Sequence, residues 1–480
     1  MYVQAKLSAY TETGQAKLSI EVPKQRSYTG PRPVIPCSLA DTPCATLGVR
    51  GVVNRLNATL GTSRTSHKLH TILEDFIERN YDFGTAYALL RPVWNTENSG
   101  NIQDELRRRE EQDREHRQNA LEGKPFAIPL LRPRRVWDLC SNHVVPSWIA
   151  YGRPTPISHA WVDEKDRADV LTPINGKEWP VPIPKDADLN LIRIEMLNLG
   201  AEYAWLDVLC LRQKGGPRED LHVEEWRLDV PTIGGVYKPV YEHEKAVVIY
   251  LNGLGRPLRL KDGDLDSNRN WFRRAWTLQE AGHQCIIASH MPDGPMHAQW
   301  IDGRNYETAL LTRFHEELNS VPRGTNHIFA TLAEMQKRVS TNLVDRVAGL
   351  AFPLRPYTIP AYHESESLED AWTALVNAMD SEMRAHLLFV YPGVGLGCKK
   401  WRPTWDQVMK QPLPEDVDDL LAHVLHGDKT DEDWFYGYCI EKGHVQGFDV
   451  GSAEGRDQCG ELVVKAADGI VHTFKIHVTH

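Results

Sequence analysis

A tryptophan and a glutamate four residues apart are the side chains of this sequence best placed to do chemistry. They belong to residues 270–280, N-W-F-R-R-A-W-T-L-Q-E, which predict a helix that is capped near Ser267 and ends at Gly282. In such a helix Trp276 and Glu280 share one face, because side chains three and four residues apart are neighbours. An aromatic plane beside a carboxylate can hold and polarise a ligand.

The same predicted helix has an apolar face and an arginine. Trp271, Ala275 and Leu278 follow the spacing i, i+4, i+7, so we expect this face to pack on a core. Arg273 is predicted to lie one turn before the tryptophan of the other face. Without a ligand, Arg273 and Glu280 would form only a surface ion pair, and the tryptophan would be a core residue.

Further polar and aromatic side chains follow two predicted strands. Residues 203–210 form a nearly continuous apolar run with Asp207 as its one acid, which is typical of a strand buried on both faces. The segment T-P-I-S-H-A-W predicts a second strand, which ends in Ser158, His159 and Trp161. Ligands of parallel sheets bind beyond the carboxyl ends of the strands. We therefore expect these groups to meet the aromatic–carboxylate pair in one crevice.

Each of these side chains also has a purely structural interpretation. Asp207 can cap the loop after its strand, and Ser158 and His159 can satisfy backbone groups at a strand end. Trp161 and Trp276 can be ordinary core residues. The residues alone leave these alternatives open.

Strands and helices alternate around these groups. Short apolar runs predict strands, and amphipathic stretches between them predict helices. This alternation implies crossover connections, and therefore an α/β fold with a parallel sheet and helices on both faces. The predicted strands are 135–139, 155–161, 203–210, 245–251 and 285–288, and the predicted helices are 186–199 and 222–241.

The chain is expected to have three parts. Residues 1–125 predict an N-terminal arm and a helical region. Within it, residues 2–22 predict an edge hairpin or a loose arm, and residues 101–123 predict a solvated helix or a mobile linker. Residues 126–300 contain the α/β pattern. Residues 301–480 predict a C-terminal α+β region, in which a helical segment precedes a small antiparallel sheet.

The C-terminal pattern is less regular. Residues 297–326 predict irregular structure, residues 327–355 and 367–385 predict helices, and strands follow. Two alternating runs within 460–478 predict a hairpin closed by a two-residue Asp-Gly turn at 468–469.

Composition and charge limit the classes of function. The 480 residues carry a formal net charge of −10, which disfavours a general nucleic-acid binder, because phosphate contacts need an excess of Lys and Arg. No apolar run approaches the roughly 20 residues that span a bilayer, and the start of the chain lacks a signal-peptide pattern. We therefore expect a cytoplasmic protein without a membrane span. The 8 cysteines include no C-x-x-C pair, so we expect free thiols, no metal site and no nucleophilic role for Cys210.

Three blocks of the sequence resemble, in order, the hallmark blocks of the fungal heterokaryon-incompatibility (HET) domain. The first is I-S-H-A-W at 157–161, the second is Y-A-W-L-D-V-L-C-L-R-Q at 203–213, and the third is R-A-W-T-L-Q-E at 274–280. The resemblance covers residues 134–290 and continues loosely to Trp405. Its lesser matches are Glu225-Trp226, Val236-Tyr237 and Asp345-Arg346-Val347.

HET domains are similar in turn to TIR domains, which have a flavodoxin-like parallel sheet. Several TIR domains cleave NAD through a glutamate placed four residues after a tryptophan, which is the spacing of Trp276 and Glu280. The resemblance therefore implies loss of nicotinamide from NAD, with NAD as the substrate and no cofactor. The transition state is a ribosyl cation, which a carboxylate in a pocket without water can stabilise.

The resemblance also implies roles for single residues. Glu280 is the expected catalytic carboxylate. The tryptophans would stack on a ring, the serine, histidine and arginine would hold phosphates or riboses, and the aspartate would orient a ribose or a loop. The expected substrate-binding residues are Ser158, His159, Trp161, Asp207, Arg274 and Trp276.

Two functions follow from this resemblance. The first is hydrolysis or cyclisation of NAD during fungal non-self recognition and programmed cell death, by a domain that is a homo-oligomer when active. The alternative is a non-catalytic cell-death module that self-associates or binds a protein partner. An assay of NAD consumption separates the two.

Overall fold

The structure is a computed structural model, and its internal contacts divide the chain into two units, residues 1–420 and 421–480. Each unit is described by itself. The structure describes residues 5–7, 28–65, 69–94, 102–121, 126–127, 131–237, 246–280, 284–289, 294–302, 305–320, 327–354, 358–417, 420, 422–427, 429–437, 442–447, 458–465 and 469–478.

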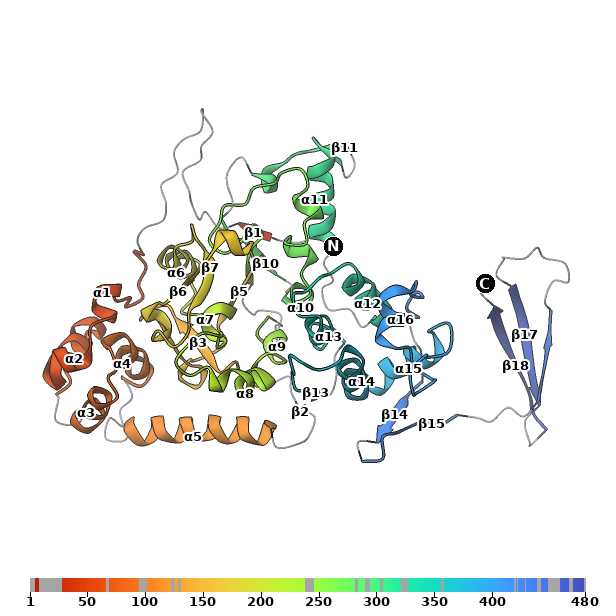
Figure 1. Cartoon of the computed structure of the whole chain (residues 1–480), viewed down its shortest axis with the longest axis horizontal. Helices are drawn as coiled ribbons and strands as arrows, with labels where there is room; N and C mark the ends of the chain where they lie inside the picture. The colour runs from red at the N-terminus through yellow and green to blue at the C-terminus, as the bar shows by residue number, and fades with distance from the viewer. Residues whose placement is uncertain are drawn as a thin grey trace. The chain divides into compact units, whose positions relative to one another are not determined.

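The described part of the first unit is organised around a 7-stranded sheet with the spatial order β1-β10-β9-β5-β8-β3-β4 (Figure 1). In that order the strands span Ala5–Leu7, Cys285–Ile287, Val247–Tyr250, Thr155–His159, Tyr203–Leu206, Arg135–Asp138 and His143–Pro146.

Most of this sheet is parallel. β1, β10, β9, β5 and β8 run in one direction, whereas β3 pairs antiparallel with both β8 and β4. Counted from β5, the parallel strands β5, β8, β9 and β10 follow the flavodoxin-like spatial order 2-1-3-4. The direction of winding reverses between β5 and β9, and α/β sheets bind ligands at such a position, outside the carboxyl ends of the strands.

The sequence of the central strands explains their place in the sheet. Every residue of β5, β8 and β9 is buried. The apolar runs of β8 and β9 predict strands covered on both faces, whereas β5 is buried although its Thr155, Ser158 and His159 are polar. Helices flank the sheet (Figure 1). The predicted α/β class with a mainly parallel sheet is confirmed. The flanking helices are α6 (Leu189–Asn198), α7 (Asp207–Cys210), α8 (Asp220–Asp229), α9 (Ile233–Tyr237) and α10 (Thr277–Glu280), with the 3₁₀ turn η8 (Trp271–Arg273) before α10.

One predicted strand is shorter than the sequence suggests. The apolar run 203–210 is a strand only as far as Leu206, and Asp207 starts the helical turn α7. The three apolar residues after the aspartate are buried as part of α7. Apolar periodicity cannot show this change, because a buried helical turn and a buried strand both read as an unbroken apolar run.

The N-terminal region is helical, as predicted. In α3 the apolar stripe of Ile72, Leu73 and Phe76 is buried, and residues 101–123 contain the long helix α5. Of the edge hairpin or loose arm expected over residues 2–22, the described part of the chain contains the parallel edge strand β1, and the other residues lie outside it. The helices are α1 (Cys37–Ala40), α2 (Cys44–Leu60), α3 (His70–Glu78), α4 (Phe83–Leu90) and α5 (Ile102–Leu121).

The rest of the first unit is mainly helical, and its core is continuous with that of the sheet. The expectation of irregular structure over residues 297–326 is wrong, because the two-stranded pair β11–β12 and the 12-residue helix α11 lie there. The polar residues of α11 outnumber its buried Phe314 and Leu318, which weakens the periodic signal. The helices are α11 (Ala309–Ser320), α12 (Ile328–Gln336), α13 (Val344–Ala348), α14 (Leu368–Ala378), α15 (Ser381–Phe389) and α16 (Trp405–Lys410).

Short antiparallel pairs complete the first unit: β2 (Phe126–Ala127) pairs with β13 (Thr358–Ile359), β6 (Arg167–Val170) with β7 (Val181–Pro184), and β11 (Trp300–Asp302) with β12 (Asn305–Tyr306).

The second unit is a small antiparallel β structure, as predicted. The hairpin within 460–478 is confirmed, and Asp468 of the predicted two-residue turn lies outside the described residues. The unit contains β14 (Val424–Gly427) paired with β15 (Glu432–Phe435), and a sheet of β16 (Gly443–Gln446), β17 (Gln458–Lys465) and β18 (Val471–Val478).

Candidate active site

Glu280 meets the end of β5 through a hydrogen bond. The Ser158 hydroxyl donates to Glu280 Oε2 at 2.5 Å, and the indole N–H of Trp271 donates to Ser158 Oγ at 2.7 Å. Ser158 is 1% exposed. The site therefore combines the last residue of α10, the first residue of η8 and the next-to-last residue of β5.

The chemistry of the donors fixes the direction of this chain of hydrogen bonds. An indole can only donate, so Ser158 Oγ must accept from Trp271 and use its single proton for Glu280. Glu280 Oε2 is consequently an acceptor, and any proton on this carboxyl group belongs on Oε1. One oxygen of Glu280 is held in position, and the other is left for a proton or a ligand.

Burial raises the pKa of Glu280 to about 7, and the charge of Asp207 adds to this effect. The hydrogen bond from Ser158 and the positive charges of His159 and Arg274 act in the opposite direction and do not cancel it. A carboxyl group in this state changes protonation near neutral pH, which suits a group that must stabilise a cation and exchange a proton.

His159 is held by Asp207, which is the residue that follows β8. His159 Nε2 lies 2.9 Å from Asp207 Oδ1, and its Nδ1 lies 3.2 Å from the carbonyl oxygen of Ala160. Both partners are oxygen acceptors, and this arrangement favours a proton on each ring nitrogen. Burial lowers the pKa of His159, but the charge and hydrogen bond of Asp207 outweigh this and keep the pKa above its usual value.

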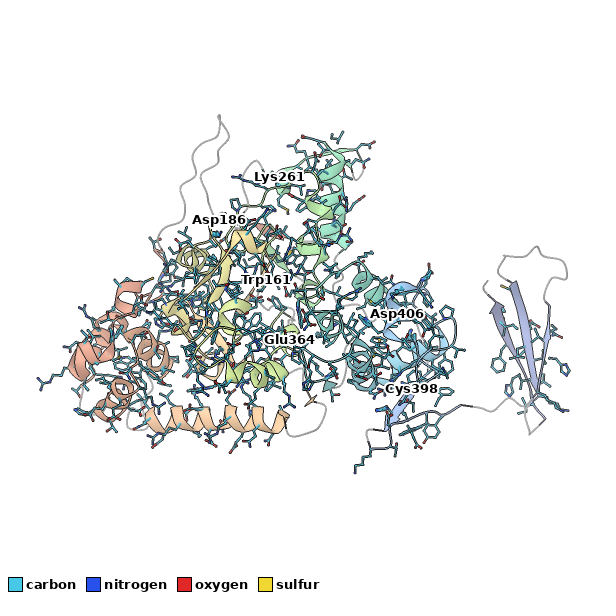
Figure 2. The ribbon with its side chains drawn as sticks, viewed as in Figure 1. Trp161, Asp186, Lys261, Glu364, Cys398 and Asp406 are labelled. Carbon is cyan, nitrogen blue, oxygen red and sulfur yellow. The ribbon has the colours of Figure 1, made fainter. Side chains whose placement is uncertain are left out.

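Trp161 forms an aromatic platform with a cation beside it. Its ring stacks on His159 with centroids 5.8 Å apart, and the guanidinium of Arg274 lies 5.9 Å from the indole centroid. Trp161 directly follows the His159-Ala160 end of β5 and is labelled in Figure 2.

Arg274 is a partly buried cation among acids. Burial lowers its pKa, and the charges of Glu280, Asp345 and Asp207 act against this. Within the described residues, the guanidinium of Arg274 has no hydrogen-bonded carboxylate. A partly buried guanidinium whose donors are not paired with an acid is suited to an anionic group of a ligand.

Trp276 belongs to the edge of the same site through Asp345. Asp345 accepts hydrogen bonds from Trp276 and from the Tyr362 hydroxyl, the latter at 2.8 Å. Burial raises the pKa of Asp345 to about 6 against the lowering effect of these two donors. Trp276 is partly exposed, so its ring is accessible for stacking.

Residues 270–280 are not the single helix that the sequence predicts. They form η8, an extended Arg274 and the short helix α10, so Trp276 precedes the helix and does not share a helical face with Glu280. The physical reason is a backbone pairing. Arg274 forms a parallel bridge with Val339, Ala275 N–H donates to the Val339 carbonyl at 3.0 Å, and Val339 N–H donates to the Arg273 carbonyl at 2.7 Å.

The predicted apolar side of this segment is nevertheless correct, since Trp271, Ala275 and Leu278 are all buried. The alternative of a surface ion pair between Arg273 and Glu280 is wrong. Arg273 donates to the carbonyl of Lys337 at 3.2 Å, while Glu280 faces Ser158.

Arg338 holds the same segment through two hydrogen bonds. Its Nη1 donates to Thr277 Oγ1 at 2.7 Å and to the Arg274 carbonyl at 3.1 Å. Burial lowers the pKa of Arg338 to about 10. The start of α10 is thus fixed by a side chain that comes from the residues between α12 and α13.

The expected site residues therefore lie together in one region. Ser158 and His159 end β5, Asp207 follows β8, and Glu280 is bonded to Ser158, so the neighbouring strand ends meet as predicted. Sequence reasoning missed the donor role of Trp271, the acid Asp345 and the supporting Arg338. Of these three residues, only Asp345 could have been found from the sequence, because it belongs to the Asp345-Arg346-Val347 segment that matches the HET resemblance.

Two nearby side chains complete the description. Gln279 is 7% exposed, and neither its amide oxygen nor its amide nitrogen has a hydrogen-bond partner. Tyr237 is buried and donates to the Ile157 carbonyl at 3.0 Å, and burial together with the charge of Glu280 raises its pKa. Cys210 is buried, and burial raises its pKa to about 12, so its thiol stays protonated.

Comparison of the chain with family models, curated proteins and solved structures found no match. No helix among the described residues has the length and apolar character needed to cross a membrane. In the described part of the chain, no three His, Cys, Asp or Glu side chains are grouped so that they could bind a metal ion. Cys37, Cys44, Cys140, Cys210, Cys398 and Cys459 are free thiols.

Proposed function

We propose that the chain cleaves the bond between nicotinamide and ribose in NAD, with Glu280 as the catalytic carboxylate. The observation that carries this proposal is the Ser158–Glu280 hydrogen bond, which fixes a partly buried carboxyl group at the carboxyl end of a parallel strand. The resemblance of the three sequence blocks to HET and TIR-like domains supports the choice of substrate.

The chemistry needs one well-placed carboxylate. The bond between C1′ and the nicotinamide nitrogen breaks, its electron pair leaves with the nitrogen, and nicotinamide departs neutral. The positive charge passes to the ribose, where ionised Glu280 stabilises it. Water then adds to C1′ and gives its proton to Glu280 or to solvent, and an internal nucleophile in place of water would give a cyclic product.

The charged and aromatic groups around Glu280 fit the rest of such a substrate. Arg274 offers unpaired donors for a diphosphate oxygen, and the indole of Trp161 beside it offers a ring face for stacking. The imidazolium of His159 adds a second positive charge near the strand end. These groups would hold the substrate while Glu280 acts at the ribose.

The test is release of nicotinamide from NAD by the purified full-length chain, at several protein concentrations. Glu280→Gln keeps an acceptor for Ser158 but removes the charge, so activity should fall by two or more orders of magnitude. Glu366→Gln is the matched control, because burial also raises the pKa of Glu366 although it lies outside the site. Full activity of Glu280→Gln would remove this glutamate from the mechanism.

A second candidate function is a non-catalytic cell-death module that acts by self-association. It is favoured by the exposed apolar side chains of the second unit, where Val445, Val471 and Phe474 are each about half exposed. This candidate predicts that mass measurements show assembly at rising concentration while no nicotinamide is released at any concentration. Under both candidates we place the protein in the cytoplasm of a fungal cell, in non-self recognition and programmed cell death.

A further inference from the structure

A cavity lies at the amino end of β5, away from the candidate active site. It has a volume of about 220 Å³, and its walls come from the residues before β3, the turn before β5 and the middle of α9. Pro154, which precedes β5, is in the wall, whereas Ser158 of the candidate active site is near the carboxyl end of the strand. Four residues of strand separate the two by about 13 Å.

The charged lining residues of this cavity that the structure describes are both arginines. Arg132 Nη1 donates to the Ala150 carbonyl at 3.1 Å, and Arg153 Nη1 donates to the Gly235 carbonyl at 3.2 Å. Each arginine is therefore fixed by a backbone oxygen. Within the described residues, Arg132 makes no ion pair with a carboxylate, so its remaining donors and its charge are available to a ligand.

A buried hydroxyl also lines the cavity. Ser147 is 2% exposed, and its Oγ has no hydrogen-bond partner. A buried hydroxyl without a partner costs free energy, and most such groups in proteins have one. An oxygen acceptor placed in the cavity would supply the missing partner.

The remaining walls are apolar. Pro133, Pro154 and Val236 line the cavity, and no acid occurs among its described lining residues. The volume exceeds that of several water molecules, each of which occupies about 30 Å³ in the liquid. The space therefore fits an anionic head group together with a compact apolar body, and not only a bare ion.

We propose that this cavity binds a small organic anion, with a carboxylate or phosphate held by Arg132, Arg153 and Ser147 and an aromatic or branched apolar body against the proline walls. The site is distinct from the Glu280 site and does not depend on the function proposed for it.

The binding test uses the full-length chain and four probes in isothermal titration calorimetry. Benzoate and phenyl phosphate carry the anion and the ring, benzyl alcohol carries only the ring, and inorganic phosphate carries only the anion. We expect benzoate or phenyl phosphate to bind at least tenfold more tightly than both control probes, and the better of the two identifies the head group. Binding of neither aromatic anion, or equal binding of benzyl alcohol, would overturn the proposal.

Variants locate the bound probe. Arg132→Met and Ser147→Ala should each weaken binding by about tenfold, because each removes a hydrogen bond to a charged group. Arg218→Met, which changes an exposed arginine, and Arg274→Gln, which changes the candidate active site, should leave binding unchanged. Loss of binding in Arg274→Gln but not in Arg132→Met would place the probe in the other site and refute the assignment.

Stability measurements separate a ligand role from a structural one. The Ser147 hydroxyl has no partner without ligand, so Ser147→Ala should unfold at the same temperature as the parent chain or higher, while binding the probe more weakly. A structural serine would instead lower the unfolding temperature. That result, with unchanged affinity for the probe, would overturn the role of Ser147.

Discussion

At the scale of single residues, Glu280 shows a conflict between stability and function. Its carboxyl group is buried deeply enough for the pKa to reach about 7, so at neutral pH the fold carries a partly ionised acid in a poorly hydrated place. Such a group destabilises the folded chain wherever it is charged. Its presence is easier to explain by chemistry than by packing.

Glu280→Gln should therefore stabilise the protein at alkaline pH. The folded pKa of about 7 lies above the ordinary value of 4.5, so the folded state binds more protons between these values and stability falls as pH rises from 4.5 to 7. The difference between the two pKa values corresponds to a loss of at most about 3 kcal/mol in the free energy of unfolding. Urea unfolding at pH 8 should show a gain up to this size for Glu280→Gln.

Below about pH 3.5, one unit under the ordinary value of 4.5, the same substitution should give little or no gain, because the carboxyl group is then mostly neutral in both states. Measuring the stability gain of Glu280→Gln at both pH values provides the control, because a gain caused by altered packing would be the same at both. A loss of stability at pH 8 would show that the carboxylate is compensated in the folded state.

The pH dependence of activity provides a second prediction at this scale. If ionised Glu280 stabilises the ribosyl cation, kcat/KM for NAD should rise with pH and level off above a midpoint near 7. Ser158→Ala should move this midpoint upward, because the Ser158 hydrogen bond lowers the pKa of Glu280. A rate that falls between pH 6 and pH 8 would require the protonated acid and contradict the proposed role.

At the scale of elements, the sequence predicts the framework of the site but not its exact backbone. β8 and the aspartate after it follow from a nearly continuous apolar run, whereas the strand that carries Ser158 and His159 is predicted from a short segment that ends in polar and aromatic residues. Glu280 is predicted as a site residue because it is a carboxylate four residues after a tryptophan. The interruption at Arg274 could not be predicted, because its cause is a backbone pairing with Val339, far along the chain. Local periodicity contains no record of such a partner.

The same limit explains the groups that were missed. Trp271 is predicted as a core residue, and it is one, but its indole N–H also directs the Ser158 hydroxyl toward Glu280. Arg338 reaches the start of α10 from a connection between two helices. Roles that depend on one hydrogen bond between distant segments leave no pattern in a single sequence.

The contact between α4 and β4 gives a third prediction. Asp82 caps α4 by accepting a hydrogen bond from Thr85 N–H. Its Oδ2 also lies within hydrogen-bond distance of His143 Nε2, at 2.8 Å. A Cβ at Gly84 would lie 2.4 Å from atoms of the His143 ring. His143 is 2% exposed and held at both nitrogens, so the ring cannot move aside. Gly84→Ala should cost about 1–3 kcal/mol in the free energy of unfolding.

A double-mutant cycle checks that the cause is this overlap. The ring is absent in His143→Ala, so adding Gly84→Ala to that variant should cost much less than in the parent chain. Equal costs in both backgrounds, measured by urea unfolding, would show that the alanine acts elsewhere, for instance on Ala40.

At the scale of the whole molecule, the two units differ in how they can be stable. The core of the first unit runs from the sheet to the C-terminal helices, and the first unit contains both the candidate site and the cavity at the amino end of β5. The three-stranded sheet β16-β17-β18 of the second unit leaves most of its described side chains exposed. A small sheet without a well-covered face is marginal by itself in water. The predicted borders at residues 125/126 and 300/301 stay predictions.

Removal of residues 421–480 should therefore leave the first unit folded. A chain of residues 1–420 keeps the sheet, Glu280, Ser158 and the helices α11 to α16, so its thermal unfolding midpoint should match that of the full chain. Under the catalytic proposal it should also release nicotinamide from NAD at the full-length rate when the rate is measured at one dilute concentration.

The concentration dependence of activity tests assembly by the second unit. If the activity of the full chain rises with protein concentration and that of the shortened chain does not, the exposed apolar strands of the second unit drive assembly. A shortened chain that unfolds at a lower temperature would contradict the independence of the first unit.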